Sequence, residues 1–176
     1  ATDEMLSIAL RHKPHAACIV PEKRTEVTTE GGLDAARLQG ELMRYTQELG
    51  AAGIRVSLFI EPEAAQLEAA VALGAPVVEL HTGAYCEASG AERDRHLARI
   101  IAAARKAEEL GLECHAGHGL SFDTVGPVAA IPTLHELNIG HFLIGEAIFS
   151  GLDSAIKRMR ALMDKARAEA VGERSA

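Results

Sequence analysis

The sequence has few aromatic residues. Phe, Tyr and Trp together make up 3% of its 176 residues, and Trp is absent. A hydrophobic core must therefore be built from Ala, Val, Leu and Ile, which favours helices packed on a buried sheet. The chain is 48% hydrophobic and 24% charged, the balance of an ordinary globular protein. A chain of this length buries roughly two thirds of its unfolded surface, so we expect a single domain, residues 1–176.

Cysteine and basic charge are also scarce. The three cysteines, Cys18, Cys86 and Cys114, form no CxxC pair, and an odd count without such a pair predicts reduced thiols in a cytoplasmic protein. Cys18 and Cys114 lie in apolar runs, so we expect both to be buried and inert. The net charge of −7 argues against a nucleic-acid or membrane partner. It leaves room for an anionic small molecule, because N–H groups at a helix N-terminus bind phosphate without basic side chains.

No apolar stretch is long enough to cross a bilayer, and the chain shows instead a regular alternation of helical and strand patterns. Short apolar runs predict five strands, near residues 16–20, 54–60, 76–81, 112–116 and 135–139. Helical spacing predicts helices at residues 3–12, from a cap at Asp34 to about 49, and at 63–73, 91–110, 123–131 and 142–170. Repeated strand–helix units of this kind need parallel strands.

Five strands are three fewer than a (β/α)₈ barrel contains. The chain opens directly on a helical pattern at Asp3, so we expect the first three βα units of such a barrel to be missing from it. A five-stranded doubly wound sheet fits the same count, and the number of strands does not separate the two folds.

Polar and glycine residues concentrate where the predicted strands end. Gly117-His118-Gly119 follows the fourth strand, and Gly140-His141 follows the fifth, just before the last helix. In a barrel these are the positions where loop amides and a helix N-terminus bind a phosphate group. The simpler interpretation is that the glycines only make turns. Their occurrence at two consecutive strand ends favours a phosphate site.

Two ionisable side chains are candidates for chemistry. Alternation along the third strand puts Glu79 on the face opposite Val78 and Leu80, which would pack against outer helices and aim the carboxylate into the barrel. A carboxylate there is costly unless it is paired or works in acid–base chemistry, and a structural ion pair is the alternative. His118 is suited to general acid or base catalysis, although a histidine in a Gly-rich turn is often only a hydrogen-bonding residue.

A zinc site is a further interpretation that the histidines and cysteines suggest. The side chains concerned are His81, Cys114, His115 and His118. Zinc sites draw their ligands from short, fixed spacings, which this set does not have. We therefore expect no metal site.

Four motifs together resemble pyridoxine 5′-phosphate synthase of the vitamin B6 pathway. They are the runs Val20–Gly32, Glu79–Gly83, Ala116–Leu120 and Glu136–His141. The first and last are long and unusual, and the resemblance covers essentially the whole chain. It implies an α/β fold of the (β/α)₈ TIM-barrel type, of which this chain supplies about the last five βα units. It also implies a homo-octameric enzyme that uses no metal or organic cofactor.

The resemblance implies an activity and residue roles as well. The family condenses 3-amino-2-oxopropyl phosphate with 1-deoxy-D-xylulose 5-phosphate to give pyridoxine 5′-phosphate, inorganic phosphate and water. By motif, the family's proton donor corresponds to His118, and its transition-state-stabilising carboxylate to Glu79. The contact to the deoxyxylulose phosphate corresponds to Thr28. The residues that bind the aminoketone phosphate correspond to Gly119, Gly140 and His141.

The sequence departs from the family in one respect. The family's two proton acceptors, a histidine and a glutamate, lie on strands that this chain does not contain, and nothing in residues 1–11 replaces them. We therefore expect the chain alone to be inactive. Two other interpretations stay open: a non-catalytic phosphate-binding remnant, and an unrelated TIM-barrel lyase or epimerase for sugar phosphates. Thr28 within its long loop argues against the second.

Overall fold

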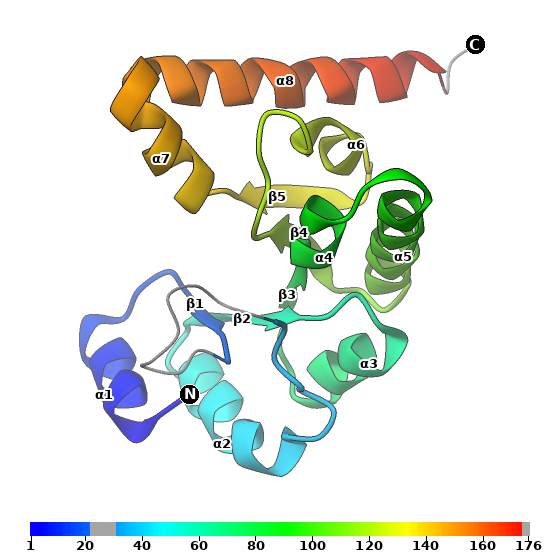
Figure 1. Ribbon diagram of the computed structural model, residues 1–176. Helices are drawn as coiled ribbons and strands as arrows, with labels where there is room; N and C mark the ends of the chain where they lie inside the picture. The colour runs from blue at the N-terminus through cyan, green and yellow to red at the C-terminus, as the bar shows by residue number, and fades with distance from the viewer. Residues whose placement is uncertain (22–30, 174–176) are drawn as a thin grey trace.

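Five parallel strands form the centre of the computed structural model, which describes residues 1–21 and 31–173 (Figure 1). The strands are β1 (Ala16–Ile19), β2 (Arg55–Ile60), β3 (Val77–His81), β4 (Glu113–Gly117) and β5 (Leu134–Asn138). Each strand pairs in parallel with its neighbours in the order β1-β2-β3-β4-β5. The order never reverses about a switch point, as it does in a doubly wound sheet. The predicted strands and their barrel-type order are confirmed.

Helices connect the strands and cover the outer face of the sheet. They are α1 (Asp3–His12), α2 (Gln39–Ala51), α3 (Ala64–Ala72), α4 (Gly83–Glu87), α5 (Gly90–Glu109), α6 (Val125–Ala129), α7 (His141–Ser150) and α8 (Leu152–Glu173). α2, α3 and α5 pack against β2, β3 and β4, while α8 runs along the top of the view in contact with α6 and α7 (Figure 1). Within the part of the chain that the structure describes, no helix is long and apolar enough to cross a membrane.

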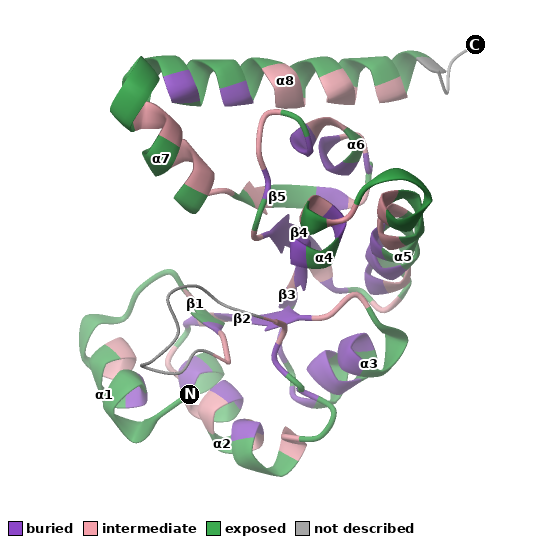
Figure 2. Ribbon diagram, viewed as in Figure 1, coloured by how far each residue is buried: buried purple, intermediate pink, exposed green. Residues whose placement is uncertain are grey.

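The main hydrophobic core lies between the strands and these outer helices. Alternate strand residues face it, among them Leu58, Ile60, Val78 and Leu80, none of which is exposed to solvent. A smaller apolar cluster joins α6 to α8. Figure 2 shows burial concentrated along the strands and on the helix sides turned toward them, while much of α8 is exposed. Apolar residues thus repeat every second position in the strands and about every 3.6 positions in the helices, as the sequence predicts.

Two predicted helix boundaries are wrong. Asp34 does not cap the second helix; it accepts a hydrogen bond from the backbone N–H of Arg37 at 3.2 Å and closes a separate turn before α2. The predicted helix at 142–170 is two helices, because Gly151 adopts a φ of 81° and ends α7. The sequence pattern also misses α4, since five residues are too few to show a helical period.

We expect the outer face of β2 to be critical for stability. Leu58 is fully buried, so Leu58→Ala should lower the free energy of unfolding by about 2–5 kcal/mol, through lost hydrophobic transfer and the cavity left behind. Val71 on α3 is 45% exposed and offers a control, because Val71→Ala should change this free energy by less than about 0.5 kcal/mol. Urea unfolding followed by circular dichroism measures both. Equal losses of unfolding free energy in the two variants would contradict the assignment of Leu58 to the buried face of β2 and of Val71 to the exposed side of α3.

Candidate active site

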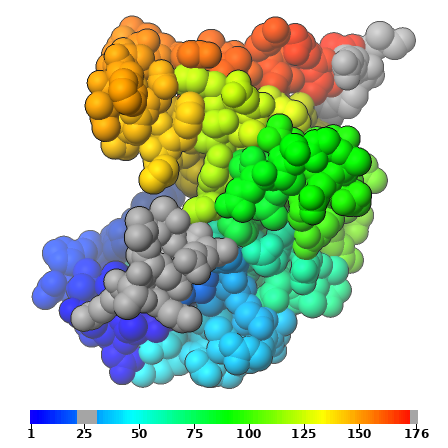
Figure 3. Space-filling view, in the orientation of Figure 1, coloured from blue at the N-terminus to red at the C-terminus, as the bar shows by residue number. Residues whose placement is uncertain are grey.

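One cavity gathers most of the residues predicted from the strand-end motifs. It has a volume of about 280 Å³ and lies at the carboxyl ends of the strands, where α/β barrels carry their sites. Figure 3 shows the molecule hollowed between the α7 segment and the N-terminal part of the chain. The lining is drawn from all five strands or the segments that follow them: Cys18, Val20, Phe59, Glu79, His118, Gly119, Leu120, Asn138, Ile139, Gly140, His141 and Phe142.

Glu79 points from β3 into the open barrel, on the face that strand alternation predicts. Nδ2 of Asn138 donates a hydrogen bond to its Oε2 at 3.0 Å, and the Cys18 thiol lies 3.9 Å from the same oxygen. Gly117 on β4 leaves room for the carboxyl group, because a Cβ there would overlap it. Burial raises the pKa of Glu79, so its protonated form persists to higher pH than that of a surface glutamate. The cavity thus holds a carboxyl group suited to proton exchange or to electrostatic stabilisation.

The prediction that two cysteines are buried is half right. Cys114 is buried in the core, but Cys18 is exposed at the cavity wall. Desolvation of its sulfur against the strand, and the negative charge of Glu79, raise the pKa of the Cys18 thiol to about 11. Cys114 and His115 point to opposite faces of β4, which separates two of the four zinc candidates. In residues 1–21 and 31–173, no three His, Cys, Asp or Glu side chains are grouped so that they could hold a metal ion.

Charged residues also line the inner face of the sheet toward the start of the strands. Glu113 forms an ion pair with Arg55, and its Oε1 lies 2.8 Å from Nε2 of His115. Hydrogen bonds from Arg55 and then from His115 lower the pKa of Glu113 to about 2. Nδ1 of His115 lies 3.7 Å from Glu136. His115 favours the carboxylate form of Glu79 and so opposes the effect of burial on the pKa of Glu79. This layer therefore helps to set the charge of the cavity carboxyl group.

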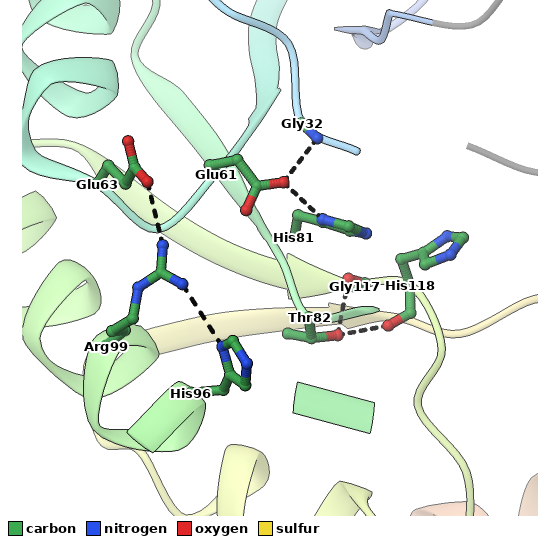
Figure 4. A network of polar contacts seen from close by, with 9 residues as sticks. All are labelled: Gly32, Glu61, Glu63, His81, Thr82, His96, Arg99, Gly117 and His118. Carbon is green, nitrogen blue, oxygen red and sulfur yellow. Dashed lines mark hydrogen bonds and ion pairs between the residues drawn. The ribbon is translucent and has the colours of Figure 1, made fainter. Parts of the chain in front are cut away.

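His118 is held at the cavity in a turn with unusual backbone geometry. Its φ is 79° and that of Gly119 is 77°, a left-handed region that residues with a side chain adopt at a cost. The fully buried hydroxyl of Thr82 lies 2.8 Å from the carbonyl oxygen of Gly117 and 2.5 Å from that of His118 (Figure 4). Thr82 thus fixes the point from which the histidine side chain leaves the backbone. Burial, and then the neighbouring His81, lower the pKa of His118, so the neutral ring predominates at neutral pH.

Gly140 and His141 begin α7 on another wall of the same cavity. Gly140 is the N-cap of this helix, and the first N–H groups of an α-helix have no acceptor within it. These donors and the positive end of the helix dipole are available to an anion bound in the cavity. Gly119 also lines this space. Thr28, the remaining predicted contact, lies outside the described residues.

Sequence reasoning missed three contributors to the site: Asn138, Thr82 and the pair formed by Glu61 and His81. Asn138 had a usable signal, because alternation along the fifth strand puts it on the inner face two residues before Gly140. The other contacts join residues that are 20 to 36 positions apart. They depend on the pairing of neighbouring strands, which local patterns do not reveal.

Comparison with known proteins connects this geometry with one family. The model of the family described as pyridoxal phosphate biosynthesis protein PdxJ matches residues 1–165. The chain belongs to the PdxJ family. Proteins named pyridoxine 5′-phosphate synthase are similar to it, with 68% identity over 167 residues in Rhodospirillum rubrum, 62% over 171 in Jannaschia sp. and 61% over 169 in Zymomonas mobilis. These matches cover 94%, 95% and 96% of this chain and 67%, 69% and 66% of the three relatives, so the chain spans about two thirds of their length.

Membership of the PdxJ family confirms the resemblance inferred from the four motifs. PdxJ proteins are TIM-barrel enzymes of vitamin B6 biosynthesis, and the five parallel strands are accordingly part of a (β/α)₈ barrel. An unrelated lyase or epimerase is excluded by the same finding.

The raised pKa of Glu79 gives a prediction about stability. The folded protein favours the neutral carboxyl group, so its contribution is complete below the ordinary pKa of a glutamate, about 4.3, and is lost as pH rises through the raised value. Glu79→Gln keeps the size of the side chain and removes the titration. We expect the Tm of the unsubstituted protein to fall relative to that of the variant as pH rises above the ordinary glutamate value of about 4.3. A difference in Tm between the two proteins that stays constant with pH would contradict the raised pKa of Glu79.

Proposed function

We propose that this chain supplies the phosphate-binding and proton-donating part of a pyridoxine 5′-phosphate synthase. The reaction joins 3-amino-2-oxopropyl phosphate to 1-deoxy-D-xylulose 5-phosphate and gives pyridoxine 5′-phosphate, inorganic phosphate and water. The name shared by the relatives supports this activity. The observation that carries the proposal for this chain is that Glu79, His118, Gly119, Gly140 and His141 line a single cavity.

The phosphate groups serve as handles for two flexible substrates. The phosphate of 3-amino-2-oxopropyl phosphate binds at Gly119, Gly140 and His141, where the N-terminus of α7 supplies donors and a positive dipole end. This local arrangement works despite the net charge of −7, because backbone groups rather than basic side chains hold the anion. Binding energy from the handle is used to orient the reacting end of the substrate. Thr28 contacts the second phosphate, a role that rests on its motif alone.

Proton transfer is the other requirement of the reaction. Imine formation, dehydration, loss of phosphate and ring closure each move protons, and positioned side chains accelerate such steps. His118 is the proton donor, and its lowered pKa makes the imidazolium a stronger acid than a surface histidine. Glu79, when ionised, stabilises positive charge that develops in the transition states, and its burial strengthens that effect.

We also propose that the protein works as a homo-oligomer, with the octamer suggested by the family resemblance. An exposed apolar surface supports this assembly. Ile144, Ile148 and Phe149 on α7 are 61%, 78% and 89% exposed, and Leu152 and Ile156 on α8 are about half exposed. Contiguous apolar residues of this kind commonly meet another protein surface.

Gly140 provides a test of the phosphate site. No atom lies within 4 Å of the place where its Cβ would stand, so Gly140→Val should fold while its side chain blocks the approach of a phosphate oxygen. We expect inorganic phosphate to raise the Tm of the unsubstituted chain by mass action. The variant should lose this protection, which thermal denaturation with increasing phosphate measures.

Gly145→Val is the matched control for this experiment. Gly145 lies within α7, and it too has open space where a Cβ would stand. This control should keep the protection by phosphate. Protection of equal size in both variants would show that phosphate binds elsewhere.

Turnover distinguishes the synthase from a non-catalytic phosphate-binding remnant. By the family resemblance, two proton acceptors belong to strands outside these 176 residues, and each such group contributes about 10²–10⁴-fold. We expect purified residues 1–176 to form pyridoxine 5′-phosphate at least about 10²-fold more slowly than a form extended upstream to the length of the relatives. Equal rates would show that the acceptors have been misplaced. No product from either form would favour the remnant.

A further inference from the structure

Glu61 and His81 form a hydrogen-bonded pair beside the cavity to which none of the roles above applies. Nδ1 of His81, at the end of β3, lies 2.7 Å from Oε1 of Glu61, which directly follows β2 (Figure 4). The backbone N–H of Gly32 donates to the same oxygen at 2.9 Å. Chiefly because of the hydrogen bond with His81, the pKa of Glu61 is lowered. Glu61 is therefore a carboxylate at neutral pH.

This pairing fixes the proton of the His81 ring. A carboxylate only accepts hydrogen bonds, so Nδ1 of His81 carries a proton, and in the neutral ring Nε2 has a free lone pair. His81 is only 8% exposed, and its Nε2 is buried without a hydrogen-bond partner among the described residues. Leaving a buried polar atom unpaired costs on the order of 1–3 kcal/mol. Native proteins keep few such atoms, and a catalytic role is one of the reasons for keeping them.

The unpaired nitrogen faces His118. The centroids of the His81 and His118 rings lie 5.1 Å apart, and Figure 4 shows Nε2 on the side of the His81 ring that is turned toward His118. Phe59 packs edge-on against His81, with the two ring centroids 5.2 Å apart. Gly83 leaves room for Nε2 of His81, because a Cβ at position 83 would overlap that nitrogen. A hydrogen bond between the two rings requires a ring nitrogen of His118 to lie about 2.9 Å from Nε2 of His81, the usual hydrogen-bond distance.

We propose that Glu61 and His81 are positioning residues for His118. Glu61 holds the proton of His81 on Nδ1, and Nε2 of His81 accepts a hydrogen bond from one ring nitrogen of His118, so that the other nitrogen faces the cavity. This inference rests on the proposed function, in which His118 donates a proton to the substrate. That proton leaves from the nitrogen that faces the cavity, and the proton directed at His81 stays in place. Neither Glu61 nor His81 changes its protonation.

The charges around His118 fit this arrangement. The titratable groups near it are His81 on β3, Cys86 and Glu87 on α4, and His141 on α7. Burial has the largest effect and lowers the pKa of His118; His81 and His141 lower it further, while Glu87 raises it. A hydrogen bond to a neutral His81, backed by the carboxylate of Glu61, favours the charged ring of His118 before transfer. After His118 has given up its proton, the same hydrogen bond favours the tautomer of His118 whose remaining proton points at His81.

Glu61→Gln is the sharpest test, because it keeps the shape of the side chain. The amide can donate to Nδ1 of His81, which moves the ring proton to Nε2, where it opposes the N–H of His118. We expect the pKa of His118 to fall further and kcat to drop about 10²-fold, with KM changed by less than about threefold. Since His118 acts in its protonated form, kcat should begin to decline at lower pH in the variant.

Side-chain ¹⁵N NMR of residues 1–176 measures the tautomers without any substrate. At about pH 8, the unsubstituted protein should show a proton on Nδ1 of His81 and none on its Nε2. This measurement remains decisive even if the Glu61→Gln variant does not fold. Glu63→Gln is the control: Glu63 lies two residues further along the same segment and pairs with Arg99 at 3.1 Å on the surface. It should leave both histidines and kcat unchanged.

Two results would overturn the positioning role. One is a proton on Nε2 of His81 in the unsubstituted protein, and the other is identical titration of His118 in the Glu61→Gln and Glu63→Gln variants. Rates are compared in whichever form makes pyridoxine 5′-phosphate, residues 1–176 or the extended one. Equal kcat for the two variants would reject the inference and leave the proposed function standing. Absence of product from both forms would reject the function, and the histidine spectra would still decide the pairing.

Discussion

The division of each strand into an apolar outer side and a polar inner side is the constraint on which the rest of the structure depends. Leu58, Val78 and Leu80 point outward into the core under the helices, and this orientation leaves Glu79 and His81 facing inward. Successive strand residues alternate, so a slip of one position would put the charged side chains into the apolar layer. The same packing energy that builds the core therefore sets the direction of the candidate site residues on the sheet.

Parallel pairing brings the ends of the strands to one edge, and the site is assembled there from short-range contacts between neighbours. Thr82, after β3, binds carbonyl groups of the turn after β4, and Asn138 at the end of β5 reaches Glu79 in β3. Glu61, after β2, holds His81 at the end of β3 in the same way. Two of these contacts join adjacent strands, and the contact of Asn138 with Glu79 joins strands with one strand between them. Rigid strands thus hold the side chains at defined separations, as a site for proton transfer requires.

The sequence predicts the strands well because buried parallel strands are short apolar runs separated by glycine-bearing turns. It also indicates His118, Gly119 and Gly140, since each follows such a run directly. Local sequence patterns predict helix boundaries wrongly where two patterns overlap. The apolar pattern continues past Gly151 and hides the helix break, and a turn uses the capping side chain of Asp34 before α2 begins. Contacts such as that of Glu61 with His81 depend on strand pairing, so they become visible only in three dimensions.

The central claim is that backbone donors and two ionisable side chains act on one phosphorylated substrate in the cavity. A crystal structure of the protein with bound inorganic phosphate tests it most directly. We expect the phosphate between the amides of Gly119, Gly140 and His141, within hydrogen-bonding distance of them, with His118 and Glu79 facing the same space. A phosphate bound only outside this cavity, or a cavity in which His118 points away from the anion, would contradict the account.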